Sequence, residues 1–71
     1  MMKNKDIMLC LRRLKDEGIP YCRLSEELKI PLKKFYRFTY KRNFPIIERQ
    51  QIENYLMTNF KDIVIDECFS K

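Results

Sequence analysis

The side chains best suited to binding chemistry lie in one stretch, LSEELKIPLKKFYRFTYKR, which runs from Leu24 to Arg42. No acidic residue follows Lys29 until Glu48. The section between these two residues interleaves cations with aromatic rings: Lys33, Lys34, Phe35, Tyr36, Arg37, Phe38, Tyr40, Lys41 and Arg42. Cations without acidic partners at helical spacing favour an anionic binding partner. The alternative is a helix face that is merely solvated.

Catalytic chemistry has little support in the sequence. The chain contains no histidine, which excludes Cys/His zinc fingers, histidine-activated nucleophiles and an imidazole general base. Glu26 and Glu27 are adjacent, and adjacent side chains on a helix diverge by about 100°, so they do not form a catalytic carboxylate pair. We expect no enzyme activity, no cofactor and no metal site.

The three cysteines are Cys10, Cys22 and Cys68. Their odd number and wide separation in the sequence are unlike a disulfide framework or a paired zinc site. Free cysteine mostly acts as a small apolar filler. The sequence therefore predicts structural cysteines in a reducing compartment.

Length and charge limit the possible architecture and partners. A chain of 71 residues is expected to form one small domain, residues 1–71, with a marginal core. Its net charge of +5 favours nucleic acid as partner, followed by an anionic membrane surface or an acidic protein face. No apolar run approaches the ~20 residues that a membrane-spanning helix needs, and Arg12 and Arg13 interrupt any signal-peptide core. We expect a cytoplasmic protein.

Apolar residues at helical spacing predict an all-α fold, a compact bundle of four to five helices. The first helix is expected at residues 5–17 and the fourth at about 46–59. Gly18 ends the first helix and Pro45 opens the fourth. Their buried faces are formed by Ile7, Cys10, Leu11, Leu14, Ile52, Leu56 and Phe60.

The tail, residues 61–71, permits two interpretations. Ile63, Val64 and Ile65 are β-branched and suit a short strand, but Ile63 and Glu67 lie one helical turn apart. We favour a short fifth helix. An apolar tail on so small a chain is also a candidate dimer contact.

A helix-turn-helix is expected at about residues 20–41. Pro20 begins its first helix, residues 21–29, and Pro31 ends that helix and opens the next one. The two helices are joined by a three- or four-residue turn. The inward side chains of the pair are Leu24, Leu28, Phe35 and Phe38.

The opposite side of the second of these helices carries groups that suit the DNA major groove. Arginine and lysine bind guanine edges, tyrosine hydroxyls bind acceptors or phosphates, and leucine contacts the thymine methyl. The predicted base-contact residues are Leu32, Lys33, Tyr36, Arg37 and Tyr40. The predicted phosphate contacts are Arg23, Lys34, Lys41 and Arg42. Tyr36 and Tyr40 alternatively pack together, and Leu32 alternatively covers the core or lies in a protein interface.

The segment GIPYCRLSEELKIPLKKFYRF resembles the helix-turn-helix of small phage repressor and Cro-like regulators, and the resemblance spans residues 7–56. In that family the turn usually has glycine where this chain has Lys29, and the recognition helix usually begins with serine or threonine where this chain has Pro31. Keeping the turn implies a positive φ angle at Lys29. Ser25 stands where a small residue lets the helices approach. The family's apolar positions are matched by Leu24, Leu28, Ile30, Phe35 and Phe38.

The resemblance implies a homodimeric transcriptional regulator, such as a repressor, that binds specific double-stranded DNA. Two other functions stay open. The same basic aromatic face suits a phage-encoded inhibitor of a host nucleoprotein machine, with an anti-CRISPR-like role and a host protein as partner. Stacking of single-stranded nucleic acid on Tyr36 and Tyr40 is a weaker alternative, because a helix is a poor stacking platform.

Overall fold

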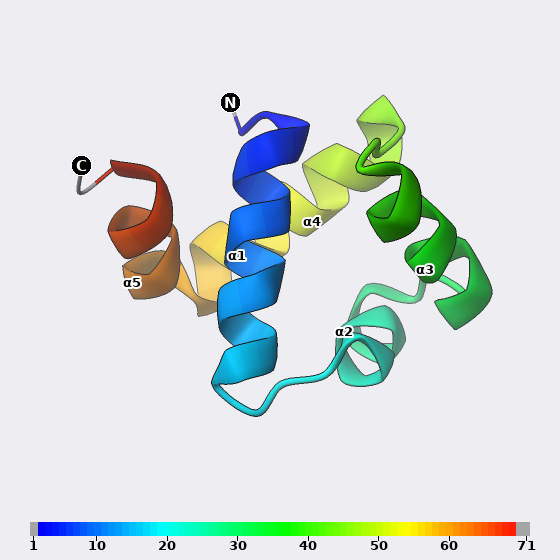
Figure 1. Ribbon diagram of the computed structural model, residues 1–71, viewed down its shortest axis with the longest axis horizontal. Coiled ribbons are helices and arrows are strands. Elements are labelled where there is room, and N and C mark those ends of the chain that lie inside the picture. Colours follow the sequence, from blue (N-terminus) through cyan, green and yellow to red (C-terminus); the bar gives the residue numbers. More distant parts are fainter. Residues whose placement is uncertain (1, 70–71) are drawn as a thin grey trace.

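Helices make up most of residues 2–69, the part of the chain that the computed structural model describes (Figure 1). The order is α1 (Asn4–Asp16), α2 (Tyr21–Leu28), α3 (Leu32–Lys41), α4 (Ile46–Asn59), α5 (Lys61–Val64) and a π-helical turn, η1 (Ile65–Phe69). These described residues contain no strand, so the predicted all-α class is confirmed. Each boundary predicted for the first, second and fourth helices lies within one residue of the observed one.

The tail continues as helix through α5 and η1, which confirms the helical interpretation up to Phe69. The predicted helix at 61–71 extends two residues beyond the described part of the chain. Val64 is fully buried, whereas Ile65 and Phe69 are exposed. The β-branched residues Ile63, Val64 and Ile65 are therefore helical, and Val64 fills the core from α5.

Proline marks the start of three helices. Pro20, Pro31 and Pro45 each occupy the cap position immediately before the first helical residue. A proline at this point lacks only an N–H that the helix leaves unpaired in any case, and its fixed φ suits the entry. This explains why α2, α3 and α4 begin where the sequence predicted.

The core lies where α1 crosses α4 and meets the α2–α3 pair. Side chains predicted to be buried include several that are fully enclosed: Ile7, Cys10, Leu11, Leu14, Leu24, Phe35, Ile52 and Leu56. Phe38 is also buried. Leu28, the last residue of α2, and Phe60, which follows α4, are only half-buried and pack against the edge of the core. The loops contribute Ile30 and Phe44.

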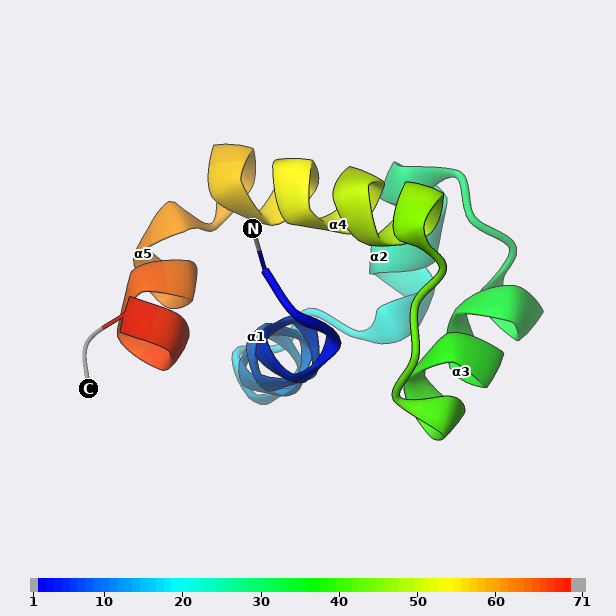
Figure 2. The same cartoon turned by 90° about the horizontal axis from the view of Figure 1, so that it is seen from above.

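The other helices lie in two groups on opposite sides of α1. In Figures 1 and 2, α1 lies in the middle, with α2 and α3 on one side and α5 and η1 on the other. α4 contacts α1, α2 and α5, so it links the two sides. The side with α2 and α3 carries the predicted binding residues, and the side with α5 and η1 carries the tail.

None of the helices in the described part of the chain is long and apolar enough to cross a membrane.

Candidate nucleic-acid interface

α3 has one buried side and one exposed side. Phe35, Phe38 and Thr39 face the core, and the Thr39 hydroxyl donates a hydrogen bond to the Tyr36 carbonyl at 2.9 Å. The opposite side is exposed, and we call five of its residues the outer face of α3: Leu32, Lys33, Tyr36, Arg37 and Tyr40. Lys34 and Lys41, also exposed, lie between this face and the buried side. Tyr40 is 89% exposed. Helical geometry thus brings together all the residues predicted to contact bases.

The turn between α2 and α3 holds the two helices in a fixed relationship. Lys29 has φ 58° and ψ 34°, the positive φ predicted at this position in the sequence analysis. The Lys29 N–H donates to the Glu26 carbonyl at 3.2 Å, and the Ile30 N–H donates to the Ser25 carbonyl at 3.0 Å. This is a Schellman motif, in which the N–H groups of a left-handed residue and of the residue after it donate hydrogen bonds to carbonyls in the last turn of the helix. The buried Ile30 then anchors the turn in the core.

Ser25 lies buried on α2. Its hydroxyl donates to the Cys22 carbonyl at 2.8 Å, so its polar group is paired without a partner on α3. A small side chain at this point lets helices approach closely, and α2 and α3 are in direct contact. The arrangement agrees with the role expected for Ser25 from the sequence.

Tyr36 is supported by a neighbouring ring rather than standing free in solvent. The centroids of Tyr36 and Tyr21 are 6.0 Å apart, and Tyr21 also contacts the buried Phe35 at 5.5 Å. The ammonium of Lys15 lies 5.6 Å from the Tyr21 ring centroid, within the range of a cation–π contact. Burial raises the pKa of Tyr21, and the charge of Arg12 opposes this effect. The Lys15 ammonium of α1 therefore lies beside Tyr21 of α2, whose ring contacts Tyr36 of α3.

The four predicted phosphate contacts lie in different surroundings. Lys41 and Arg42 are exposed at the C-terminal end of α3. The Lys34 ammonium forms an ion pair with the Glu48 carboxylate of α4 at 3.5 Å. Arg23 lies near α4, since its charge lowers the pKa of Tyr55 against the larger, raising effect of burial.

A pocket of about 430 Å³ adds cations that sequence reasoning did not select. Its lining consists of Asn4, Lys5, Met8, Leu9, Arg12 and Arg42. Lys5 and Arg12 are seven residues apart on α1, and this spacing is the signal that could have placed them on one face. Arg42 brings the end of α3 to this pocket. The Asn4 side chain joins the start of α1 to the segment after α3, because it accepts a hydrogen bond from the Phe44 N–H at 3.1 Å and donates one to the Asn43 side chain.

Residues 2–69 contain no cluster of three or more histidine, cysteine or acidic side chains arranged to hold a metal ion. Among family models, curated proteins and solved structures, none matches this chain. The function is therefore inferred from the side chains of the site itself.

Proposed function

We propose that this protein binds specific double-stranded DNA as a homodimeric, cytoplasmic transcriptional regulator, with α2 and α3 acting as a helix-turn-helix. The observation that carries the proposal is the outer face of α3, where a continuous set of basic and aromatic side chains is exposed without an acidic residue. Phe35 and Phe38 anchor the opposite side in the core. We expect neither catalysis nor a cofactor.

The side chains of the outer face of α3 suit a recognition helix. The major groove of B-DNA, about 12 Å wide, admits one α-helix. The Arg37 guanidinium suits the two acceptors of guanine, and Lys33 lies one helical turn earlier. Tyr36 and Tyr40 supply hydroxyl groups, and the exposed Leu32 suits a thymine methyl.

Backbone strain at the residues that end α2 and α3 supports a phosphate-binding role for the cations at these positions. Lys29 precedes α3 and Arg42 follows it, and both have positive φ. A left-handed conformation costs an ordinary L-residue roughly 1–2 kcal/mol, which glycine would avoid. A lysine and an arginine at these positions can offset this cost if their charges bind an anion.

DNA backbone contacts come mainly from lysine, arginine and backbone amides. We assign this role to Lys29, Lys41 and Arg42 beside the recognition helix, and to Lys5, Arg12 and Lys15 along α1. Lys34 must exchange Glu48 for a phosphate before it contributes. Arg23 contributes only if the DNA backbone also passes α4.

Selection of bound duplexes from a random pool at moderate salt tests the proposal. The expected result is enrichment of a palindromic site, because a two-fold symmetric dimer binds two equal half-sites. A variant with Lys33→Ala and Arg37→Ala should enrich no such site while keeping its helical circular dichroism spectrum. A wild-type pool that stays random after repeated rounds rejects sequence-specific DNA binding.

A phage-encoded inhibitor that binds a host nucleoprotein machine is the second candidate function. The observation that favours it is the exposed pair Ile46 and Ile47, at 59% and 68%, which lies just beyond the C-terminal end of α3. Isoleucines exposed next to a basic helix suit a protein interface. A random pool without enrichment, together with a stoichiometric complex with one host nucleoprotein that Ile47→Asp abolishes, would establish this function instead.

A further inference from the structure

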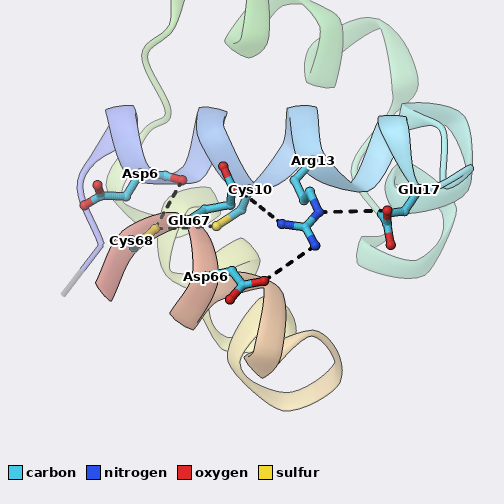
Figure 3. Close-up of polar contacts among 7 residues, drawn as sticks. All are labelled: Asp6, Cys10, Arg13, Glu17, Asp66, Glu67 and Cys68. Carbon is cyan, nitrogen blue, oxygen red and sulfur yellow. Dashed lines mark hydrogen bonds and ion pairs between the residues drawn. The ribbon is translucent and has the colours of Figure 1, made fainter. Parts of the chain in front are cut away.

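The C-terminal segment is held against α1 by a group of charges around Arg13 (Figure 3). Its guanidinium lies 3.0 Å from the Glu67 carboxylate and 3.6 Å from that of Asp66, both in η1. Glu17, one turn further along α1, lies 3.9 Å away. These contacts fix the position of η1 along α1.

This position brings two cysteines together that are 58 residues apart in the chain. The Sγ atoms of Cys10 and Cys68 lie 3.6 Å apart, and Figure 3 shows the two side chains pointing toward each other from α1 and η1. The Cys68 sulfur also lies 3.8 Å from the Asp6 carbonyl oxygen. A disulfide bond is about 2.0 Å long, so a small approach of η1 suffices to form one.

We propose that Cys10 and Cys68 are a reversible dithiol–disulfide pair, a redox modification site that links the C-terminal segment covalently to α1. The sequence predicts structural cysteines without a disulfide framework, and this proposal departs from that prediction for Cys10 and Cys68, because the fold brings together two cysteines that are far apart in the sequence. Cys22 is exposed on α2 and takes no part in the pair.

The order of reaction follows from burial. Burial, followed by the contact with Cys68, raises the pKa of Cys10 to about 12, so its thiolate is scarce at neutral pH. Cys68 is only half-buried and is therefore the sulfur that meets an oxidant first. With a low-molecular-weight disulfide such as oxidised glutathione, the Cys68 thiolate attacks one sulfur and one glutathione thiolate leaves.

The second step closes the protein disulfide. Cys10 loses its proton to solvent base and attacks the Cys68 sulfur, and the second glutathione leaves as a thiolate that takes up a proton. Two protein thiols are oxidised and one oxidised glutathione becomes two reduced molecules, so atoms and electrons balance. Because Cys10 must ionise, this step should be slow at neutral pH and faster as pH rises.

The test incubates the whole protein with mixtures of reduced and oxidised glutathione, followed by acid quenching and intact-mass measurement. The expected product is a monomer lighter by two hydrogen atoms, which reducing agent returns to the original mass. Closing so long a loop should raise Tm by more than about 10 °C. Cys22→Ser should behave like the wild type in both respects.

Cys68→Ser is the decisive variant, because a half-buried hydroxyl in place of a thiol leaves the fold intact. It should lose both the mass change and the Tm increase. The proposal is overturned if wild-type protein yields only glutathione adducts or disulfide-linked dimers. It is also overturned if Cys68→Ser still forms an internal disulfide, or if the oxidised monomer melts at the same temperature as the reduced one.

Discussion

Lys29 and Arg42 occupy the same position in the same helix-ending motif, the first after α2 and the second after α3. Their φ angles are 58° and 53°. In each case the next residue returns its N–H to a carbonyl five residues earlier, Ile30 to Ser25 at 3.0 Å and Asn43 to Phe38 at 3.1 Å. Gly18 occupies the corresponding position after α1, with φ 91°. Two of three equivalent positions therefore hold a cation where glycine is conformationally easier.

This equivalence predicts that glycine at either position increases stability and weakens DNA binding. Lys29→Gly and Arg42→Gly should each raise the free energy of unfolding by ~0.5–1 kcal/mol, because glycine adopts positive φ without the clash of a Cβ. Both variants should bind DNA more weakly than the wild type. Denaturant unfolding and binding titrations measure the two effects.

Gly18→Ala is the matched control, because it makes the reverse change at the equivalent position after α1. It should lose ~1–2 kcal/mol of stability and leave the DNA affinity of the folded protein unchanged. Glycine variants that bind DNA as tightly as the wild type would remove Lys29 and Arg42 from the interface.

A second prediction concerns the anchoring of α3. Phe35 is fully buried and contacts Tyr21, so Phe35→Ala should cost ~3–5 kcal/mol, which is most or all of the stability of so small a domain. Tyr40→Ala should change stability by no more than ~0.5 kcal/mol, because the ring is 89% exposed. Thermal melts followed by circular dichroism compare the two variants. Equal melting temperatures would mean that the buried and outer faces of α3 are exchanged.

The sequence is sufficient to predict the helices and the two faces of α3. A proline sets the start of α2, α3 and α4 through its own backbone geometry. The spacing of Phe35 and Phe38 defines the buried side of α3 within one turn. The positive φ at Lys29 is predicted differently, from the resemblance to a turn that usually has glycine at this position. The helix starts and the two faces of α3 depend on residues close together in the chain, so a single sequence contains the information for them.

Contacts between distant segments could not be predicted in this way. Lys34 has no acidic residue near it on its own helix, yet Glu48 reaches it from α4. The spacing of Tyr36 and Tyr40 permits them to pack together, but the Tyr36 ring packs on Tyr21 of α2. Such pairs depend on how helices cross, which helical periodicity alone does not specify.

The Lys34–Glu48 pair predicts that binding can be strengthened. Glu48→Gln should release the Lys34 ammonium for a phosphate and strengthen binding to all duplex sequences. The dependence of log K on log salt should become steeper by about one unit for each additional phosphate that lysine neutralises. Stability should fall by less than ~1 kcal/mol, because the Lys34 side chain is 48% exposed and water screens the ion pair. Titrations on random duplex at several salt concentrations measure the slope.

Glu26→Gln is the charge-matched control for this change, since Glu26 is an exposed residue of α2. It alters net charge equally without releasing a lysine. If both variants strengthen binding to the same extent, the effect is one of net charge, and Lys34 makes no phosphate contact of its own.

The last prediction separates recognition of bases from attachment to the DNA backbone on α3. Arg37 is an exposed residue of the outer face, and Arg37→Ala should lose ~1–3 kcal/mol on the preferred site with little change on scrambled duplex. Lys41 is the last residue of α3, where the proposed binding mode places the DNA backbone. Lys41→Ala should weaken binding to all sequences about equally and reduce the salt slope by about one unit per contact.

Both residues are exposed, so neither change should affect folding. Titrations of both variants on preferred and scrambled duplexes, each at several salt concentrations, distinguish the roles. Equal losses on the two duplexes for Arg37→Ala would make Arg37 a phosphate contact, and α3 would then not select sequence through this residue.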